Sequence, residues 1–393
     1  MSLQNALAVN KTTKKRKLEW FRMDIRAYTM ILALVGIWLL FALLSPTFLT
    51  PRNLSNLFLQ MSVTSILAIG MVLIIVAGQI DLSVGSLVGL TGGIAAILNV
   101  WHGLDPVTVI LITLAFGALI GLFAGWIVAY LAVPAFIVTL GGMLVFRGAL
   151  NGITGSMTVS PLSPGLRFIG QAYILPSIGL LLGVIAVAAV VIFQIRRRLS
   201  RAKYGFSVEP VFLTIAKIVL YAAFILGFVY VMNQYRGIPF PAILVIVLAI
   251  IFTFIARKTV FGRHIYAIGG NPDAAKLSGI HIKRRLMMIF VLMGTLCAIS
   301  GLILTARLNA ATQSAGEMYE LDAIAACVIG GTSLMGGVGT IGGALIGALV
   351  MASLDNGMSL MNLDAFWQLI VKGSILVLAV WVDIYSRSKK KSL

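Results

Sequence analysis

One acidic side chain of this sequence stands between two long apolar segments. Asp81 lies in the segment 78–83 (GQIDLS), which also contributes the polar residues Gln79 and Ser83. A carboxylate inside a membrane is unfavourable unless it is paired or hydrated, and a broken helix is tolerated there only against protein or a water-filled cavity. The segment therefore predicts a helix break beside a transport pathway, or a helix cap in which Asp81 or Ser83 accepts hydrogen bonds from the next helix. The two interpretations are compatible.

A second polar interruption, which includes Thr332 and Ser333, resembles the first. Residues 330–337 (GGTSLMGG) and 78–85 (GQIDLSVG) both place small polar residues in an apolar region. Counting the apolar segments between them puts both interruptions on the same side of a membrane. We expect Gln79, Asp81, Ser83, Thr332 and Ser333 to lie along a translocation pathway.

The basic stretch 257–285 contains a short, well-delimited helix. Asn271 is a good N-cap, Pro272 suits the first helical position, and Asp273 places negative charge in the first turn. Gly279 ends the helix after about two turns. A helix this short is marginal alone in water, so we expect either a partner that packs on it or a connector on the membrane surface. Its small side chains Ala274 and Ala275 would admit a partner closely, and its charges, with Lys276, would orient that partner.

Three cations fall within or near apolar segments: Arg147, Lys217 and Lys372. The first two lie near segment ends, where long basic side chains reach the membrane interface. Lys372 is deeper and needs a carboxylate or carbonyl partner, with Asp81, Asp355 and Asp364 as the candidates.

Several kinds of chemistry are disfavoured by the sequence. No P-loop, G-x-x-x-x-G-K-[ST], is present, so the chain itself has no cradle for ATP. The match of 337–342 (GVGTIG) to a dinucleotide fingerprint stands between apolar segments that resemble membrane spans, so dinucleotide binding is disfavoured. The three histidines are scattered, and Cys297 and Cys327 have apolar neighbours, which favours small apolar filler over metal ligands. We expect no catalytic residues, no metal and no cofactor in this chain.

Composition indicates a membrane protein. Of the 393 residues, 60% are hydrophobic and 11% charged, and the mean hydropathy is +1.04, whereas soluble domains carry roughly 25% charged residues. The sequence predicts an all-α polytopic transmembrane helical bundle. Twelve apolar segments qualify as spans, or ten crossings if 321–354 is re-entrant: 27–44, 57–78, 82–100, 107–130, 135–150, 174–194, 211–232, 240–256, 286–304, 321–334, 340–354 and 366–383.

The net charge of +18 is distributed as topology requires. Of the 30 Lys and Arg residues, 23 lie in segments 1–26, 195–203, 256–285 and the tail after Asp383, as the positive-inside rule predicts for cytoplasmic loops. Without an aromatic-studded basic domain, nucleic-acid binding is disfavoured. Both termini are expected in the cytoplasm. We divide the chain into a basic tail 1–26, a permease domain 27–385 with its loop at about 257–285, and a basic tail 386–393.

Glycines recur at four-residue spacing in three apolar segments. These rows are Gly85/Gly89/Gly93, Gly117/Gly121/Gly125 and Gly343/Gly347. Glycines four apart share one helix face and let two helix backbones approach closely. The rows predict tight helix packing, or faces that slide during gating.

Three separated motifs resemble one known family. The segments 80–86 (IDLSVGS), 266–280 (YAIGGNPDAAKLSGI) and 320–334 (ELDAIAACVIGGTSL) are similar to those of ATP-binding-cassette (ABC) importer permeases of the ribose/xylose/autoinducer branch. The resemblance extends from Trp20 to Asp383. The stretch 166–235 resembles an extra pair of spans that ribose-type permeases generally lack, and 235–239 (YRGIP) and 351–359 (MASLDNGMS) are similar to permeases for xylose.

The resemblance implies a complex and a transport function. Two permease chains, as a homodimer, would form the pathway for a monosaccharide, xylose or a related pentose, in the bacterial cytoplasmic (inner) membrane. A sugar-ABC ATPase would bind ATP and Mg²⁺ beneath them, and a periplasmic or lipid-anchored binding protein would deliver the sugar. The helix of Asn271, Pro272, Asp273, Ala274, Ala275, Lys276 and Gly279 would be the coupling helix that enters the ATPase.

Two other classes remain as alternatives at this point. An ion-coupled secondary transporter of a small polar solute would need broken helices and more membrane carboxylates than Asp81. A passive channel would need no short cytoplasmic helix.

Overall fold

The computed structural model describes residues 25–391 except 207 and 209, and most of them are helical. The basic N-terminal tail expected at 1–26 falls, up to residue 24, outside the described residues, whereas the segment expected as a separate tail from 386 continues the last helix to Lys391. The elements in chain order are α2 (Ile25–Leu44), α3 (Pro51–Val76), α4 (Val84–Val100), α5 (Pro106–Tyr130), α6 (Ala135–Thr154), α7 (Pro164–Gln171), β1 (Tyr173–Ile174), α8 (Pro176–Lys203), α9 (Val211–Asn233), β2 (Ile238–Pro239), α10 (Phe240–Lys258), α11 (Val260–Gly270), α12 (Pro272–Leu277), α13 (Ile282–Leu308), α14 (Tyr319–Ile329), α15 (Ile341–Leu360) and α16 (Ala365–Lys391).

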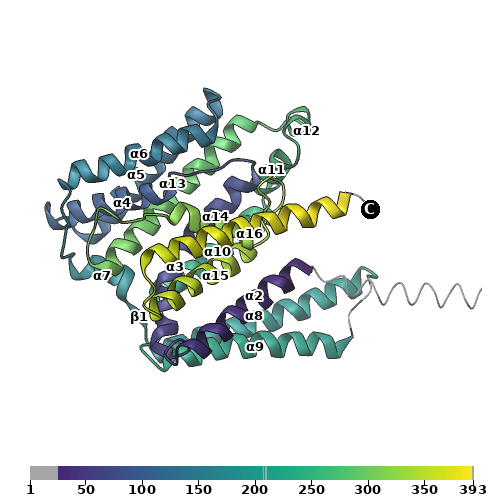
Figure 1. Ribbon diagram of the computed structural model, residues 1–393. Coiled ribbons are helices and arrows are strands. Elements are labelled where there is room, and N and C mark those ends of the chain that lie inside the picture. The colour runs from purple at the N-terminus through teal and green to yellow at the C-terminus, as the bar shows by residue number, and fades with distance from the viewer. Residues whose placement is uncertain (1–24, 207, 209, 392–393) are drawn as a thin grey trace, which may run out of the picture.

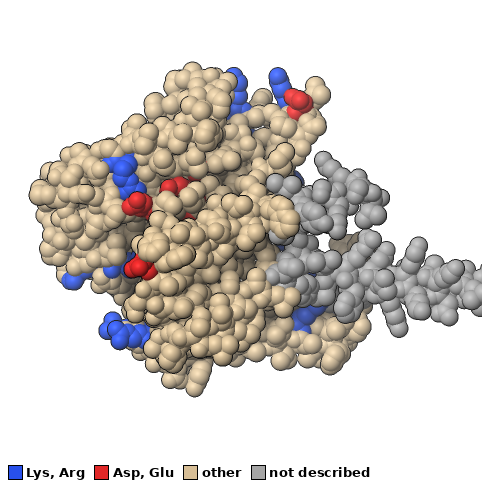
Figure 2. Space-filling model, viewed as in Figure 1, with Lys and Arg blue, Asp and Glu red and all other residues tan. Residues whose placement is uncertain are grey.

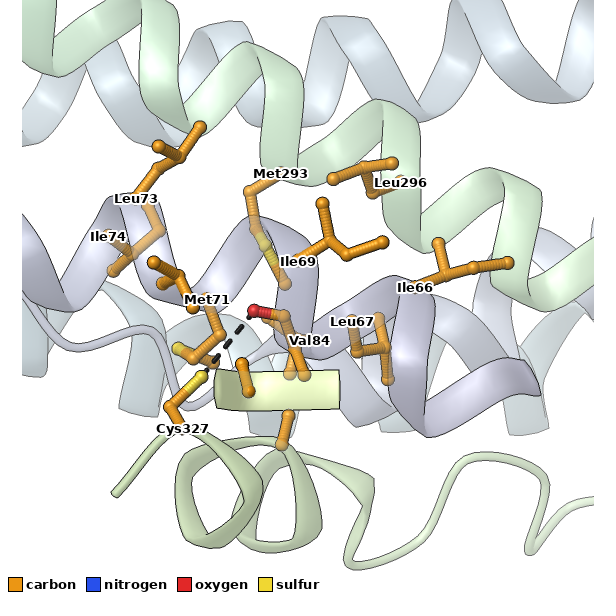
Figure 3. Close-up of a cluster of buried hydrophobic side chains, with 14 of the residues drawn as sticks. Ile66, Leu67, Ile69, Met71, Leu73, Ile74, Val84, Met293, Leu296 and Cys327 are labelled. Atoms are coloured by element: carbon orange, nitrogen blue, oxygen red, sulfur yellow. Dashed lines mark hydrogen bonds between the residues drawn. The ribbon is translucent and has the colours of Figure 1, made fainter. Parts of the chain in front are cut away.

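Helix α3 forms the centre of the core. Its most apolar stretch is 89% buried, because α13, α15, α14 and α10 pack around it. Figure 3 shows Ile69 of α3 beside Met293 of α13, with Cys327 of α14 on another side. The Cys327 Sγ donates a hydrogen bond to the carbonyl oxygen of Ala68 at 3.4 Å. Cys327 is fully buried among apolar residues, which confirms its interpretation as small core filler.

The predicted glycine rows are helix contacts. A Cβ at Gly117 of α5 would lie against the carbonyl oxygen of Gly294 in α13, and one at Gly347 of α15 would collide with the carbonyl oxygen of Ala326. Gly85 of α4 likewise lies against the backbone before α14. Helix backbones approach this closely only where one side lacks a Cβ. The packing interpretation is confirmed, while sliding during gating stays a prediction.

The helices agree with a multi-pass membrane protein. Within the described residues, eight helices are long and apolar enough to cross a membrane, and shorter apolar helices cover Met30–Leu44, Val84–Val100 and Ala365–Trp381. The face drawn in Figure 2 carries few charged side chains. The expected span at 321–334 is too short to cross by itself, because α14 has 11 residues and a helix rises only about 1.5 Å per residue.

Three of the four basic segments lie at one end of the molecule. The turn after α8, the helix α12 and the C-terminal end of α16 all lie toward the right of Figure 1, opposite β1 and α7. We call these ends the α12 side and the β1 side. Lys and Arg residues that are dispersed in sequence are therefore gathered in space, as a common cytoplasmic face requires.

Helices α8 and α9 form a hairpin at the edge of the bundle. They pack mainly on each other, and α9 also contacts α3. None of the most apolar stretch of α9 is buried, so this hairpin is the part of the described chain most open to lipid. It coincides with the additional pair of spans expected between 166 and 235.

A short antiparallel pair closes the base of the hairpin. Tyr173 and Ile174 of β1 pair with Pro239 and Ile238 of β2, which the expectation of an all-α fold did not include. The amide of Phe240 also donates to the carbonyl oxygen of Ala172 at 2.9 Å. The chain thus enters and leaves the hairpin at one place on the β1 side.

Candidate functional site

The first helix break begins where α3 ends. Helix α3 stops at Val76, and Gly78 adopts a positive φ of 76°, a conformation that favours glycine. The Asp81 carboxylate oxygen Oδ1 accepts hydrogen bonds from the Ser83 amide at 2.9 Å and from its hydroxyl at 2.7 Å. Asp81 is buried just ahead of α4. Asp81 therefore stabilises the turn before α4, but it accepts from the N-cap residue Ser83 rather than from an amide within α4, and the Ser83 side chain makes no capping hydrogen bond.

The second break, 330–340, is folded just as tightly. Thr332 and Ser333 are fully buried. The Ser333 amide donates to the carbonyl oxygen of Val338 at 2.8 Å, and its hydroxyl accepts from the amide of Met335 at 3.2 Å. The Thr332 amide donates to the carbonyl oxygen of Cys327 at 2.9 Å and caps α14. The Ser333 side chain and these backbone hydrogen bonds stabilise a compact turn between α14 and α15.

The two breaks touch each other. The Gly337 amide donates a hydrogen bond to the carbonyl oxygen of Val76 at 2.9 Å, and a Cβ at Gly339 would press on the Val76 side chain. We call this contact between the end of α3 and residues 336–339 the break junction. The expectation that both interruptions lie on one side of the membrane is consistent with this contact. Of the five residues expected along a pathway, four are buried and Gln79 is partly exposed.

The short helix α12 starts as expected. The Asn271 side-chain oxygen Oδ1 accepts from the amide of Ala274 at 3.0 Å, and Pro272 is the first helical residue. Gly279 follows with a positive φ of 79°. The predicted cap and first turn are confirmed, and the helix proper ends at Leu277.

The surface of α12 differs from the expected one. Ala275 is buried against its own chain, where α12 contacts α11 and α13. It is therefore unavailable to a partner in this structure. Asp273, Ala274 and Lys276 are exposed, and Leu277 is 90% exposed. Leu277 is not among the residues predicted from sequence to contact a partner, because a leucine within a helix usually packs in the core. Its position at the tip of a polar loop is the sequence feature that indicates exposure.

Helix α11 connects α12 to the break junction. The Tyr266 hydroxyl donates to the carbonyl oxygen of Gly339 at 2.7 Å. A Cβ at Gly269 would collide with the carbonyl oxygen of Val76 and the amide of Gly337. Burial raises the pKa of Tyr266, so its hydroxyl keeps its proton and remains a donor. The sequence indicated only a loop here, yet residues 260–270 form a helix whose end rests directly on both breaks.

Lys372, the lysine within the last apolar segment, pairs with two carboxylates. Lys372 Nζ of α16 lies 2.8 Å from Asp355 Oδ1 of α15 and 3.2 Å from Asp322 Oδ1 of α14. Asp355 was a predicted partner and is confirmed; Asp322, rather than Asp81 or Asp364, is the second. Arg147 does not simply reach the interface, because its Nη1 donates to the carbonyl oxygens of Gln313 and Ala315.

A polar pocket opens on the β1 side, and no part of it was expected. Its polar lining consists of Asn56, Gln60, Gln171, Tyr173, Arg236 and Arg307. The guanidinium of Arg236 lies over the rings of Tyr173 and Tyr235. Amides, guanidinium groups and an aromatic face together suit a small polyhydroxylated solute. The residues come from segments far apart in sequence, and the only sequence signal is two amides four residues apart in apolar α3.

The described residues contain no group of three or more His, Cys, Asp and Glu placed to hold a metal ion. The α12 side offers an exposed helix to which a partner could dock and through which helices could be moved. The β1 side offers hydrogen bonding to a polar solute.

Comparisons with known proteins identify permeases of transport systems. Residues 53–380 match the profile of the family described as "Branched-chain amino acid transport system / permease component". The chain is 51% identical, over 93% of its length and 98% of the relative's, to the xylose transport system permease protein of Haemophilus influenzae. It is 49% identical to the Escherichia coli protein of the same name, over 94% of both chains. The ribose import permease protein of Bacillus subtilis is 35% identical over 87% of this chain and 88% of its own. No solved structure gives a significant match.

Proposed function

This chain belongs to the branched-chain amino acid transport system / permease component family, and we propose that it is the membrane subunit of an ABC importer for xylose. The choice of xylose as the sugar rests on sequence identity, which is higher to the two xylose permeases, 51% and 49%, than to the ribose permease, 35%. The lipid-open pair α8–α9, expected for xylose-type rather than ribose-type permeases, supports the same choice.

We place the α12 side in the cytoplasm and the β1 side in the periplasm. Three basic segments on the α12 side favour this orientation. The membrane would then be the bacterial inner membrane, and the polar pocket lined by Asn56, Gln60 and Arg307 would face an incoming sugar. A periplasmic or lipid-anchored binding protein would deliver the sugar to that side, and a second copy of this chain would complete the pathway.

Energy would enter through α12. The chain has no P-loop, so ATP and Mg²⁺ would be bound by a partner ATPase. The exposed Leu277 supplies an apolar anchor of the kind a helix uses to dock in a groove, and Asp273 and Lys276 can orient it.

Movement of α12 would reach the helix breaks through α11. Tyr266 and Gly269 of α11 both contact the break junction. Shifting α11 would therefore change the contact between Val76 and Gly337, and with it the angle between α3 and the turn 330–340. We propose that Gln79, Asp81, Ser83, Thr332 and Ser333 form the packed, closed state of the gate.

Reconstitution tests the function and its ion-coupled alternative together. The chain would be placed in proteoliposomes with its neighbouring ATPase, and uptake of labelled xylose from its binding protein measured with and without internal ATP. We expect uptake to require internal ATP. Excess unlabelled xylose should inhibit uptake by competing for the binding protein, whereas ribose should not. In the same assay, Asn56→Leu with Gln60→Leu should slow uptake at unchanged ATPase binding. Uptake driven by a proton or sodium gradient without ATP would refute the proposal.

A further inference from the structure

The α12-side end of the α8–α9 hairpin has a stripe of polar residues on one helix face. Gln194, Arg197, Arg198 and Arg201 of α8 line a small open pocket with Thr214 and Lys217 of α9. On a helix, positions i, i+3, i+4 and i+7 lie above one another on the same face. The stripe therefore faces the neighbouring helix rather than spreading around α8.

Membrane topology alone does not explain this arrangement. The positive-inside rule is met by basic residues anywhere near the end of a span, and Arg196 and Lys203 meet it while lying outside the pocket. Segment 176–233 contains six Lys and Arg residues and one acidic residue, Glu209, which gives a net charge of +5. Arg197 and Arg201, one turn apart on this side of α8, repel each other unless an anion lies between them.

The pocket already has hydrogen-bonding groups in place. The Arg198 Nη1 donates to the Thr214 hydroxyl at 3.1 Å, and both Arg198 and Lys217 have further interactions. The Arg198–Thr214 hydrogen bond links the two helices. Arg197 and Arg201, one turn apart on α8, are exposed and complete the lining, so they are the groups we assign to the anion.

The surroundings of the pocket are those of a lipid site. Phe193 and Leu199 of α8 and Phe212 of α9, on the two helices that bear the pocket, are 64%, 63% and 76% exposed. Further along, the hairpin presents apolar helix surface to the outside, since 11% of the α8 stretch and none of the α9 stretch is buried. An anionic phospholipid matches both features: its phosphate lies at the membrane interface, level with the cationic pocket, and its acyl chains lie beside the apolar helix surface.

We propose that this pocket binds the headgroup phosphate of an anionic phospholipid, whose acyl chains lie along the exposed faces of α8 and α9. Arg197 and Arg201 contact the phosphate, and Gln194 and Thr214 are positioned to add hydrogen bonds. A protein partner is less suited to this place, because the hairpin and α12 lie at opposite edges of the molecule in Figure 1. The lipid would fix a hairpin that otherwise has few contacts with the bundle.

The chain supplies a matched control for the test. Arg197→Gln with Arg201→Gln removes two charges from the pocket, and Arg196→Gln with Lys203→Gln removes two charges from the same helix outside it. The purified full chain would be delipidated in neutral detergent, and its melting temperature measured with added phosphatidylglycerol, phosphatidylcholine or inorganic phosphate. Where the pocket pair does not purify, Arg201→Gln alone replaces it, with Arg196→Gln as its control.

We expect phosphatidylglycerol to raise the melting temperature of the wild type and of the control pair by several degrees, and that of the pocket pair by less than half as much. Phosphatidylcholine and inorganic phosphate should give no comparable increase. Equal responses of the two pairs would overturn the proposal, because they would indicate diffuse attraction of charge. A full effect of inorganic phosphate would overturn the lipid as the source. An unchanged lipid response with loss of ATPase binding in the pocket pair would identify a protein contact instead.

Discussion

The backbone amide of Gly337 donates a hydrogen bond to the carbonyl oxygen of Val76 at 2.9 Å. This contact joins the end of the central helix α3 to the turn between α14 and α15. Helix α11 rests on the same place through Gly269. The element proposed to meet the ATPase is therefore only one helix away from the interruptions of the membrane core.

The tip of α12 should carry the ATPase contact. We predict that Leu277→Asp abolishes ATPase association, since it replaces an exposed apolar anchor with a charge, and leaves the melting temperature within about a degree of wild type because Leu277 packs little in this chain. Pull-down of the ATPase checks the first result. Lys276→Ala should be milder, because an exposed ion pair contributes up to about 1 kcal/mol. Wild-type recovery of the ATPase with Leu277→Asp would place the coupling surface elsewhere.

Ala275→Arg should fail for a different reason. Ala275 is 4% exposed, so an arginine there must displace its own neighbours, and overpacking of this kind commonly costs about 1–3 kcal/mol. We predict a lowered melting temperature together with weaker ATPase binding. A variant as stable as wild type would contradict the burial of this position.

Tyr266 should transmit movement rather than hold the complex together. Tyr266→Phe removes the hydrogen bond to Gly339, worth roughly 1 kcal/mol, and we predict reduced uptake at unchanged ATPase binding. Tyr204→Phe is the control, since Tyr204 is 70% exposed. Equal uptake by the two variants would show that this bond has no part in coupling.

Asp81 should matter more for transport than for insertion. Removing a carboxylate from a membrane segment eases insertion, but Asp81→Ala also leaves the Ser83 amide and hydroxyl without their acceptor. We predict lower sugar uptake per inserted molecule, with Asp105→Ala, at an exposed helix cap, as the comparison. Unchanged uptake per molecule would make Asp81 a dispensable cap.

The charge cluster of Lys372 should stabilise the packing of α16. Lys372→Met leaves the carboxylates of Asp322 and Asp355 without their cation. Because Lys372 and Asp355 are partly exposed, the cost should lie below the roughly 3–5 kcal/mol of a fully buried pair. We predict a marked fall in melting temperature. Adding Asp322→Asn and Asp355→Asn to Lys372→Met should recover much of it, because the uncompensated charges are then gone. A triple variant no more stable than the single one would argue against the electrostatic explanation.

Orientation can be measured with single cysteines. Ser200→Cys and Gly270→Cys lie on exposed parts of the α12 side, whereas the native Cys297 and Cys327 are buried and give little background. An impermeant thiol reagent added to intact cells should label neither position and should label both after permeabilisation. Efficient labelling of either in intact cells would reverse the topology.

The sequence predicted local features well because their causes are local. Asn271 and Pro272 start a helix through backbone chemistry that neighbouring residues determine, and the glycine rows indicated close helix contact without indicating the partner. The fold class followed from apolar segments of about 20 residues. Helix boundaries and the number of spans were harder to predict where a segment such as α14 is short and mostly buried.

Contacts between distant segments were not predictable in the same way. Asp322 pairs with Lys372 because the fold brings α14 beside α16, and nothing near either residue specifies that neighbour. The inward direction of Ala275 depends on how α12 sits against α13. The pocket of Asn56, Gln60 and Arg307 likewise exists only once α3, α13 and the chain around β1 are assembled.

The β1–β2 pair has a consequence for how this fold can be altered. Because Ala172 and Phe240 are hydrogen-bonded to each other, the helices between them could be excised and the cut ends joined by a few residues without stretching the chain. Removing an antiparallel pair also preserves the sidedness of every later segment. The α8–α9 hairpin can in this sense be removed as a unit. A shortened permease that lacks it would test directly whether the remaining helix bundle is stable on its own.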